Sequence, residues 1–367
     1  MRNFLIFLKV ISVFLISSLL LAYLSPFIHP KTIFFIPFFG LIYPILLTLN
    51  ILILIVWIVL KSKWAFPVMA TVLIGFPLHF RLYAFGSNSS EIENKKALTI
   101  MSYNVRLFDV YNPSMNQAIK SRDKIFDFLI KEDVDVMCFQ EFYHQDKPTW
   151  FKTKDSLIEV LNIVDYHFRG AHSKRHRKNF GISILSQYPM IGKGQVAFDS
   201  QSKNDCNYCI YADILFNNDT VRIYNVHLQS IKIGYEMGEE YYENKSRNSF
   251  ESLFQTVFNK LIDAYPKRAD QAIRVVNHIS KSPYPVVVCG DFNDTPLSYS
   301  YNQFNHNLID AFRNCSKGIG STYLGKIPAG RIDYIFHSED LLSSNFKIQK
   351  EKLSDHKAII CDIFQKK

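Results

Sequence analysis

The chain has 367 residues and a net charge of +9 at pH 7, and this charge is unevenly distributed. Residues 1–96 hold eight lysines and arginines against two glutamates, whereas residues 97–367 carry only +3. The basic balance therefore belongs largely to the flanks of apolar runs and is poor evidence for a nucleic-acid partner. No internal repeat or low-complexity tract is present, and residues 97–367 suffice for one large domain with a substantial core.

Three apolar runs near the N-terminus approach the roughly 17–25 residues of a membrane-spanning helix. They are Phe4–Leu24, Phe34–Leu60 and Trp64–Phe80. The third run is short and contains Gly75 and Pro77. A cleaved signal peptide is the alternative for the first run, but its length and the two following runs argue against it. We therefore predict a transmembrane segment of about three helices (4–24, 34–60 and 64–80) within residues 1–86, which contacts the lipid bilayer.

The orientation of this segment follows from its basic residues. Four of them favour one side of the membrane, namely Arg2, Lys9, Lys61 and Lys63. The positive-inside rule assigns that side to the cytoplasm, and three spans then place residues 97–367 outside it. Lys31 and Arg81 reduce the bias, and a chain with two spans would place the domain in the cytoplasm.

The cysteines leave the compartment open. Cys138, Cys289 and Cys361 lie in apolar runs and are typical of small core residues. Cys206 and Cys209 have the spacing of a zinc-binding pair but no second ligand pair at a suitable distance. In an exported domain they would suit a disulfide, and otherwise they are two thiols.

After a polar linker at residues 87–96, apolar runs of strand length alternate with amphipathic helical segments. Expected strands are Leu98–Val105, Val134–Glu141, Phe180–Ser186, Tyr208–Phe216, Thr220–Leu228, Val286–Cys289 (ended by Gly290), Arg331–Phe336 and Leu353–Ile360. Expected helices are Met115–Lys131, Phe250–Ala264 and Lys267–Ser280. This alternation predicts an α/β domain at residues 97–367.

Polar residues lie within or just beyond many of these strands. They are Asn104, Glu141, His227, Asp291, Asn293, Asp333, Asp355 and His356. Each has an ordinary structural interpretation, such as a turn residue, a solvated charge or a core histidine. It is much less plausible that every one of these ordinary interpretations is correct than that the residues form one shared site. Strands of one sheet can bring such residues together at a common edge.

The strings that hold these residues resemble the endonuclease/exonuclease/phosphatase family, which includes deoxyribonuclease I. They are Ser102–Val105, Phe139–Glu141, Asn225–Leu228, Gly290–Asn293, Arg331–Tyr334 and Ser354–His356, in the family's order. The resemblance covers about residues 97–367. It implies a four-layer α/β sandwich, with two packed, mainly antiparallel sheets flanked by helices. It also implies Mg²⁺-dependent phosphoester hydrolysis, in which Mn²⁺ is a candidate substitute.

The resemblance also implies residue roles. Glu141, Asn104 and Asp355 match metal ligands, which suits a hard cation. Asp333 matches the partner of His356, and this pair would contact the phosphate or activate water. The remaining catalytic positions are Asp291 for the water, Asn293 for the phosphate and His227 as a phosphate ligand or general acid.

Two regions depart from the family pattern. The loop that precedes Phe180 shows no evident carboxylate partner for His227 and is instead basic. Its residues Arg175, Arg177, Lys178 and Asn179 are candidate substrate-binding residues, although a solvated surface loop is the simpler explanation. A long stretch at Ile231–Pro266 is a candidate lid or a surface helix.

The sequence therefore predicts a membrane-anchored phosphoesterase that acts on phosphodiester or phosphomonoester bonds, with nucleic acid as one candidate substrate. The alternatives are a phospholipid or small-phosphoester hydrolase and a non-catalytic binding module on the same fold. No protein partner is evident.

Overall fold

The computed structural model describes residues 2–86, 95–146, 151–172, 178–198, 207–231, 250–325 and 330–366. They divide into two compact units. The first, here the helical unit, comprises Met1–Arg81, Gln229–Asp270 and Asp294–Asn302. The second, here the sandwich unit, comprises Leu82–Leu228, Gln271–Asn293 and Gln303–Lys367. Two segments that follow predicted catalytic strands thus group with the N-terminal helices.

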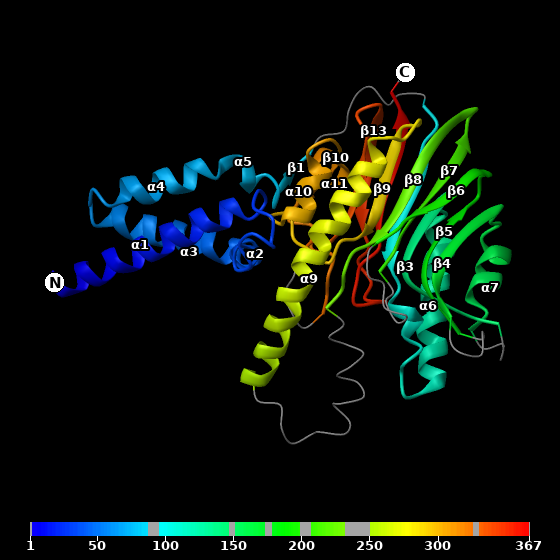
Figure 1. Cartoon of the computed structure of the whole chain (residues 1–367), viewed down its shortest axis with the longest axis horizontal. Helices are drawn as coiled ribbons and strands as arrows, with labels where there is room; N and C mark the ends of the chain where they lie inside the picture. Colours follow the sequence, from blue (N-terminus) through cyan, green and yellow to red (C-terminus); the bar gives the residue numbers. More distant parts are fainter. Residues whose placement is uncertain are drawn as a thin grey trace. The chain divides into compact units, whose positions relative to one another are not determined.

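The sandwich unit contains two six-stranded sheets (Figure 1). The first has the order β13-β14-β2-β3-β5-β4. Its strands are β2 (Leu98–Asn104), β3 (Val136–Gln145), β4 (Asp165–His172), β5 (Lys178–Ser186), β13 (Leu341–Ile348) and β14 (Ile359–Gln365). The second has the order β10-β12-β9-β8-β7-β6. Its strands are β6 (Met190–Val196), β7 (Cys209–Phe216), β8 (Asp219–His227), β9 (Val286–Asp291), β10 (Ile309–Asp310) and β12 (Asp333–His337).

Strand pairing is mainly antiparallel, as the sequence predicts, with one parallel pair in each sheet. β2 runs parallel to β3, and β8 runs parallel to β9. Parallel neighbours need a crossover connection, and helix α6 (Met115–Glu132) supplies it between β2 and β3. A short additional ribbon pairs β1 (Ala84–Phe85) with β11 (Lys317–Gly318).

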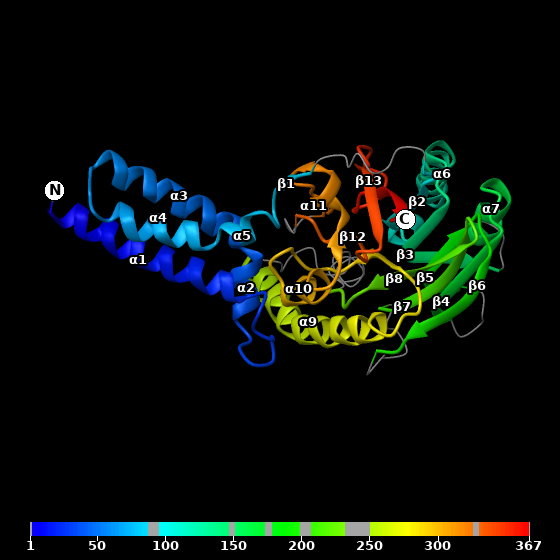
Figure 2. The same ribbon diagram turned by 90° about the horizontal axis from the view of Figure 1, so that it is seen from above.

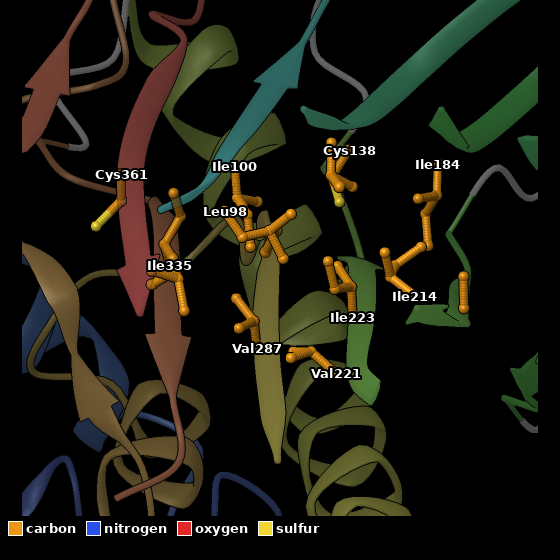
Figure 3. Close-up of a cluster of buried hydrophobic side chains, with 14 of the residues drawn as sticks. Leu98, Ile100, Cys138, Ile184, Ile214, Val221, Ile223, Val287, Ile335 and Cys361 are labelled. Carbon is orange, nitrogen blue, oxygen red and sulfur yellow. The ribbon is translucent and has the colours of Figure 1, made fainter. Parts of the chain in front are cut away.

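The space between the sheets holds the main core, which consists of aliphatic side chains from both inner faces (Figure 3). Ile100 and Ile184 come from the first sheet, and Ile223 and Val287 come from the second. The three cysteines Cys138, Cys289 and Cys361 are buried free thiols in this core, which confirms their interpretation as small core residues. Cys209 is a buried free cysteine in β7, and Cys206 lies outside the described residues.

Helices cover the outer faces of both sheets and complete the four predicted layers (Figure 2). Helices α6 and α7 (Thr153–Val160) lie against the first sheet. The C-terminal part of α9 (Phe250–Ile279) lies against the second, where Tyr224 Oη and His278 Nδ1 form a 2.8 Å hydrogen bond. Two short helices follow β9 and β10, namely α10 (Tyr299–Asn305) and α11 (Ala311–Cys315).

Helix α9 joins the two helices expected at Phe250–Ala264 and Lys267–Ser280, so separate helices were the wrong prediction there. Pro266 lies inside it and removes one backbone hydrogen bond. Tyr265 and Arg268 on either side are both buried, and their packing holds the helix continuous. Residues 232–249 of the predicted insertion lie outside the described part of the chain.

The N-terminal helices of the helical unit are α1 (Arg2–Leu24), α2 (Ile36–Leu41), α3 (Tyr43–Val59), α4 (Ala65–Ile74) and α5 (Phe76–His79). The apolar run 34–60 divides at Ile42, and the run 64–80 divides at Gly75. A proline stands in the first two positions of each following helix, where its missing N–H costs least. Among the described residues, α1 is the helix long and apolar enough to cross a membrane, and α3 and α4 are shorter apolar helices.

Helices α1, α3 and α4 pack through a small apolar core that includes Leu15, Trp57 and Val68. Polar groups join the same helices. Asn50 Nδ2 in α3 donates to Leu15 O in α1 at 3.1 Å, and Trp57 Nε1 donates to Ser12 Oγ at 2.8 Å. Such interhelical hydrogen bonds add to the packing that stabilises apolar helix bundles.

Candidate active site

The predicted catalytic residues converge where the parallel strands end. In the second sheet the register pairs His227 of β8 with Asp291 of β9, and Asp333 of β12 with Asp291 on its other side. In the first sheet Asn104 ends β2, beside Gln140 of β3. Asn104 Nδ2 donates to Asp291 Oδ2 at 3.0 Å, so the two sheets meet directly at this edge.

The buried carboxylate of Asp291 is the centre of the site. Its Oδ2 accepts from Asn104 and lies 3.7 Å from both His227 Nε2 and His356 Nε2. Its Oδ1 accepts the Asn293 backbone N–H at 2.8 Å. Three side chains that are distant in sequence thus surround one carboxylate. The sequence alone predicted only that these residues share one edge of the fold.

His356 is held by Asp333, as the family resemblance implies. Its Nδ1 lies 3.0 and 3.1 Å from the two carboxylate oxygens of Asp333. Burial opposes the charged imidazolium, but the carboxylates of Asp333, Asp291 and Asp355 outweigh it and raise the pKa of His356 to about 10. The surrounding carboxylates therefore favour the imidazolium form of His356, whose Nε2 lies 3.7 Å from Asp291 Oδ2.

The backbone is unusual at two of the site residues. Glu141 has a φ of +49° and lies where the pairing of β3 with β5 shifts register between Phe139 and Phe142. Such a bulge turns a side chain away from the regular alternation. Asn293 has a φ of +54°, and its Nδ2 donates to Leu228 O at 3.2 Å. Left-handed conformations at non-glycine residues are uncommon and concentrate at functional sites.

Gly290 explains how β9 approaches β8 so closely. A Cβ added at Gly290, where φ is +157°, would stand 2.0 Å from the carbonyl oxygen of Val226. Any larger residue would push the two parallel strands apart. Glycine at this position therefore keeps His227 and Asp291 in register.

A left-handed turn follows Asn104. The residues Arg106–Asp109 all have φ between +45° and +59°. The turn begins with the Arg106 backbone N–H donating to Asn104 Oδ1 at 3.0 Å, and it brings Arg106 Nε to 3.6 Å from Asp355 Oδ2. Since left-handed residues cost about 1–2 kcal/mol each, the turn must be held by packing, and Leu107 and Phe108 are indeed buried.

Sequence reasoning missed a polar bridge beneath the site. Gln140 Nε2 donates to Asn225 Oδ1 at 2.7 Å across the two sheets. Asn225 Nδ2 in turn donates to the backbone oxygens of Phe139 and Ser183, each at 2.9 Å. Both residues belong to the family-like strings, but only the packing of the sheets reveals that they bind each other.

Sequence reasoning also missed Tyr323 and Thr322. Tyr323 forms an isolated bridge with His356, and the two rings stand edge to face with centroids 5.0 Å apart. Burial raises the pKa of Tyr323 to about 12, with further contributions from the carboxylates of Asp355, Asp291 and Glu141. Thr322 Oγ1 accepts the backbone N–H of Asp333 at 3.2 Å. No strand-like pattern surrounds these residues, so no signal in the sequence marks them.

The candidate substrate-binding residues are described only in part. Arg175 and Arg177 lie outside the described residues. Lys178 is exposed at the start of β5, and Asn179 is buried with Nδ2 donating to Asp146 Oδ2 at 3.2 Å. Both pair with the end of β3, beyond Glu141.

Oxygen and nitrogen donors that suit a metal ion also meet here. Asp291, Asp333 and His356 each offer one ligand atom, and these atoms lie within 4.8 Å of one another. The ligands predicted from the sequence, Asn104, Glu141 and Asp355, are a different set. They provide oxygen atoms, and the Asp355 side chain is 31% exposed, which leaves space for bound water.

Comparisons with known proteins agree with this fold. Residues 101–356 match the model of the Endonuclease/Exonuclease/phosphatase family, and residues 3–82 match a Domain of unknown function (DUF8431). No curated protein matches the chain.

Similar solved structures cover the same region. A family protein from Bacteroides vulgatus is 19% identical with a TM-score of 0.53, over 74% of this chain and 100% of the other. One from Leptotrichia buccalis is 18% identical with a TM-score of 0.51, over 73% and 99%. The human Nocturnin catalytic domain is 15% identical with a TM-score of 0.50, over 74% and 95%. With its family model matched over most of its length, the chain belongs to the endonuclease/exonuclease/phosphatase family.

Proposed function

We propose that the protein is a membrane-anchored, divalent-metal-dependent hydrolase of phosphoester bonds. The observation that carries this proposal is the buried Asp291 carboxylate, which two histidines and one asparagine surround at the strand ends. A carboxylate held in this way can orient an attacking water and accept its proton. Membership of the family supports the same class of reaction.

The residues around Asp291 have complementary tasks. His356, kept as imidazolium by Asp333, donates from Nε2 to a phosphate oxygen as charge develops there. Asn293 uses one hydrogen of its amide on Leu228 O, and the second is available to the phosphate. His227, on the neighbouring strand, acts as a phosphate ligand or as general acid.

The metal ligands that we propose are Glu141, Asn104 and Asp355. They are the oxygen donors that a hard divalent cation prefers, and Asn104 Oδ1 keeps a second lone pair beside its bond from Arg106 N–H. A bound Mg²⁺ or Mn²⁺ would neutralise phosphate charge and stabilise the leaving oxygen. We assign Asp333 and His356 to the phosphate instead, because Nδ1 of His356 is already bound to Asp333.

Anchoring rests on the helical unit. Lys9 Nζ lies 5.8 Å from the ring centroid of Trp64, so the turn that contains Lys61 and Lys63 lies near the start of α1. This places the basic residues of both segments at one end of the bundle, as a cytoplasmic end requires. The catalytic domain would then lie outside the cytoplasm. A C-terminal alkaline phosphatase fusion tests this, because the reporter is active only there.

Two substrate classes fit this site. Nucleic acid is one, and a phospholipid or other small phosphoester is the other. The modest charge of residues 97–367 weighs against an enzyme that tracks along nucleic acid. A non-catalytic module on the same fold is the remaining alternative, and the complete set of polar residues around Asp291 weighs against it.

The test uses the full chain in lipid nanodiscs with Mg²⁺. Substrates are supercoiled plasmid, bis-p-nitrophenyl phosphate, p-nitrophenyl phosphate and phospholipid vesicles. We expect hydrolysis of at least one, lost with EDTA and lost in Asp291→Asn, but kept in Asp123→Asn, whose carboxylate is exposed on α6. Hydrolysis that survives in Asp291→Asn would refute the assigned site. No hydrolysis of any substrate by a folded protein would favour the non-catalytic module.

A further inference from the structure

A stack of aromatic rings joins α9 to the N-terminal helices within the helical unit. Phe258 of α9 stacks on Phe38 of α2 with centroids 4.6 Å apart, and Tyr265 meets Phe38 edge to face at 5.5 Å. Phe254, one turn before Phe258, continues the stack at 6.2 Å. Phe254 is nevertheless 64% exposed, so the stack ends in an uncovered aromatic ring.

Two polar contacts join this part of α9 to the segment between α1 and α2. Lys31 Nζ lies 2.7 Å from Asp270 Oδ2, and His29 Nε2 lies 3.4 Å from Asp270 Oδ1. The stack at one end and these contacts at the other hold the N-terminal part of α9 against the helices at two places. Its position relative to them is therefore defined within the unit.

The surroundings of Phe254 indicate what covers it. The N-terminal helices expose large apolar side chains along their length, including Phe14 (68%), Val59 (72%) and Phe66 (66%). The segment between α1 and α2 exposes further aromatic residues, Phe27 and Phe34. Exposed phenylalanine rings beside an apolar helix bundle are typical of segments that insert at the boundary of headgroups and acyl chains.

The other side of this part of α9 is polar. Lys260, Asp263 and Lys267 line a small hollow of about 140 Å³ together with Gln229 and Ser230. They lie away from the face that carries Phe254, Phe258 and Tyr265, because a helix repeats every 3.6 residues. Helix α2 covers the aromatic face at Phe258 and Tyr265 but leaves Phe254 exposed. A helix that exposes an aromatic ring on one side and lysines on the other suits the plane of a bilayer interface.

We infer that the N-terminal part of α9, Phe250–Asp270, is an interfacial membrane helix whose Phe254 inserts into the lipid bilayer. The inference rests on the proposed anchoring of α1 and adds a second, separate contact with lipid. This contact comes from a segment inserted between the catalytic strands β8 and β9. The aromatic stack joins the exposed ring of Phe254 to α2, which directly follows the exposed Phe34 and Phe35, and lipid is the occupant that such uncovered rings fit.

The test measures the depth of a tryptophan placed at position 254. Phe254→Trp and the control Val164→Trp, at a 63% exposed position of the sandwich unit, are made in the full chain. Each is reconstituted in nanodiscs of phosphatidylcholine with or without brominated acyl chains. Subtracting wild-type emission removes the contribution of Trp57, Trp64 and Trp150. Aqueous iodide is the complementary quencher.

We expect brominated lipid to reduce the added emission of Phe254→Trp at least twofold and to leave that of Val164→Trp unchanged. Iodide should do the reverse. Quenching of the added Phe254→Trp emission by iodide alone would overturn the inference. Shielding from both quenchers would also overturn it, because a protein surface would then cover the ring.

Carbonate extraction of wild-type membranes separates this inference from the anchoring on which it rests. Release of the chain into the wash would refute the anchoring and the inference together. If the chain is retained but brominated lipid leaves the added emission of Phe254→Trp unquenched, the interfacial helix alone is refuted.

Discussion

The Asp291 carboxylate accepts one hydrogen bond from a residue close in sequence and one from the other sheet. Its backbone contact comes from Asn293, two residues on, and is fixed locally. Its contact with Asn104 comes from the other sheet and depends on how the whole sandwich packs. Each contact holds one of the two carboxylate oxygens. The local contact fixes where the carboxylate lies, so loss of Asn104 should change mainly the direction in which it points.

Asn104→Ala tests this expectation. The substitution removes the donor at 3.0 Å from Asp291 Oδ2 and one proposed metal ligand. Because a misaligned catalytic group loses about 10²-fold in rate, we expect the rate constant kcat to fall by about that factor. The control is Asn116→Ala, an exposed position on α6. Full activity in Asn104→Ala would show that Asp291 needs no such support.

His337 should make stability depend on pH. It is buried, with Nε2 2.9 Å from Ser343 Oγ, and burial lowers its pKa below the ordinary value near 6.5. The unfolded chain therefore binds a proton more readily than the folded one, and stability falls as the pH drops below about 6.5. We expect His337→Gln to lose less melting temperature than wild type between pH 7.5 and pH 5.5. Equal losses, measured by differential scanning fluorimetry, would contradict this assignment.

At the scale of elements, local irregularities place the site. The bulge at Glu141, the close approach at Gly290 and the left-handed turn at Arg106–Asp109 each interrupt a regular element beside a residue of the candidate site. The turn is the most demanding of these, because none of its four residues is glycine. The strained backbone of this turn lies next to Asn104. Packing of Phe108 against Phe126 and Phe142 stabilises the turn against this strain.

Replacing Arg106 by glycine and by alanine separates the backbone strain at this position from the loss of its guanidinium group. Glycine adopts a φ of +45° without the steric cost that alanine meets. We expect Arg106→Gly to be about 1 kcal/mol more stable than Arg106→Ala, the reverse of the usual order. Both variants lose the guanidinium beside Asp355 and should lose activity equally. Chemical unfolding and initial rates measure the two effects, and a more stable alanine variant would refute the strain.

The sequence predicts the regular strands of this site better than its irregular parts. Strand-end residues such as His227 and Asp333 were found because short apolar runs identify the strands that carry them. Tyr323 was not predicted, because it forms an isolated bridge and no apolar run surrounds it in the sequence. The continuation of α9 through Pro266 was also not predicted, because tertiary packing of Tyr265 and Arg268 overrides the local preference of proline.

At the scale of the whole molecule, the N-terminal helices and the catalytic fold are not separate in sequence. The helical unit takes in Gln229–Asp270 and Asp294–Asn302, which begin directly after the strings that contain His227 and Asn293. Arg81 Nη2 donates to Asn302 Oδ1 at 2.7 Å, and Phe38 covers Phe258 and Tyr265. Residues that continue from the catalytic strands thus depend on the N-terminal helices for their packing.

Deleting residues 2–82 should therefore damage the remaining chain. The deletion removes Phe38 and Lys31 and leaves the apolar face of α9 without its cover. We expect the truncated protein to associate in size-exclusion chromatography and to be cleaved early within residues 250–270 by limited proteolysis. The full chain in nanodiscs is the control. A truncated protein that is monomeric and resists cleavage there would show that α9 holds its place unaided.

The hydrogen bond between Asn104 and Asp291 crosses from one sheet to the other, so its length reports the spacing of the two sheets. That spacing is set by the aliphatic layer that includes Ile100, Ile223 and Val287 (Figure 3). A substitution that thickens or thins this layer would change the distance between Asn104 and Asp291 although it touches neither of them. If these residues act as proposed, interior volume in this fold is a determinant of reaction rate, and selection on activity would constrain apolar residues as well as polar ones.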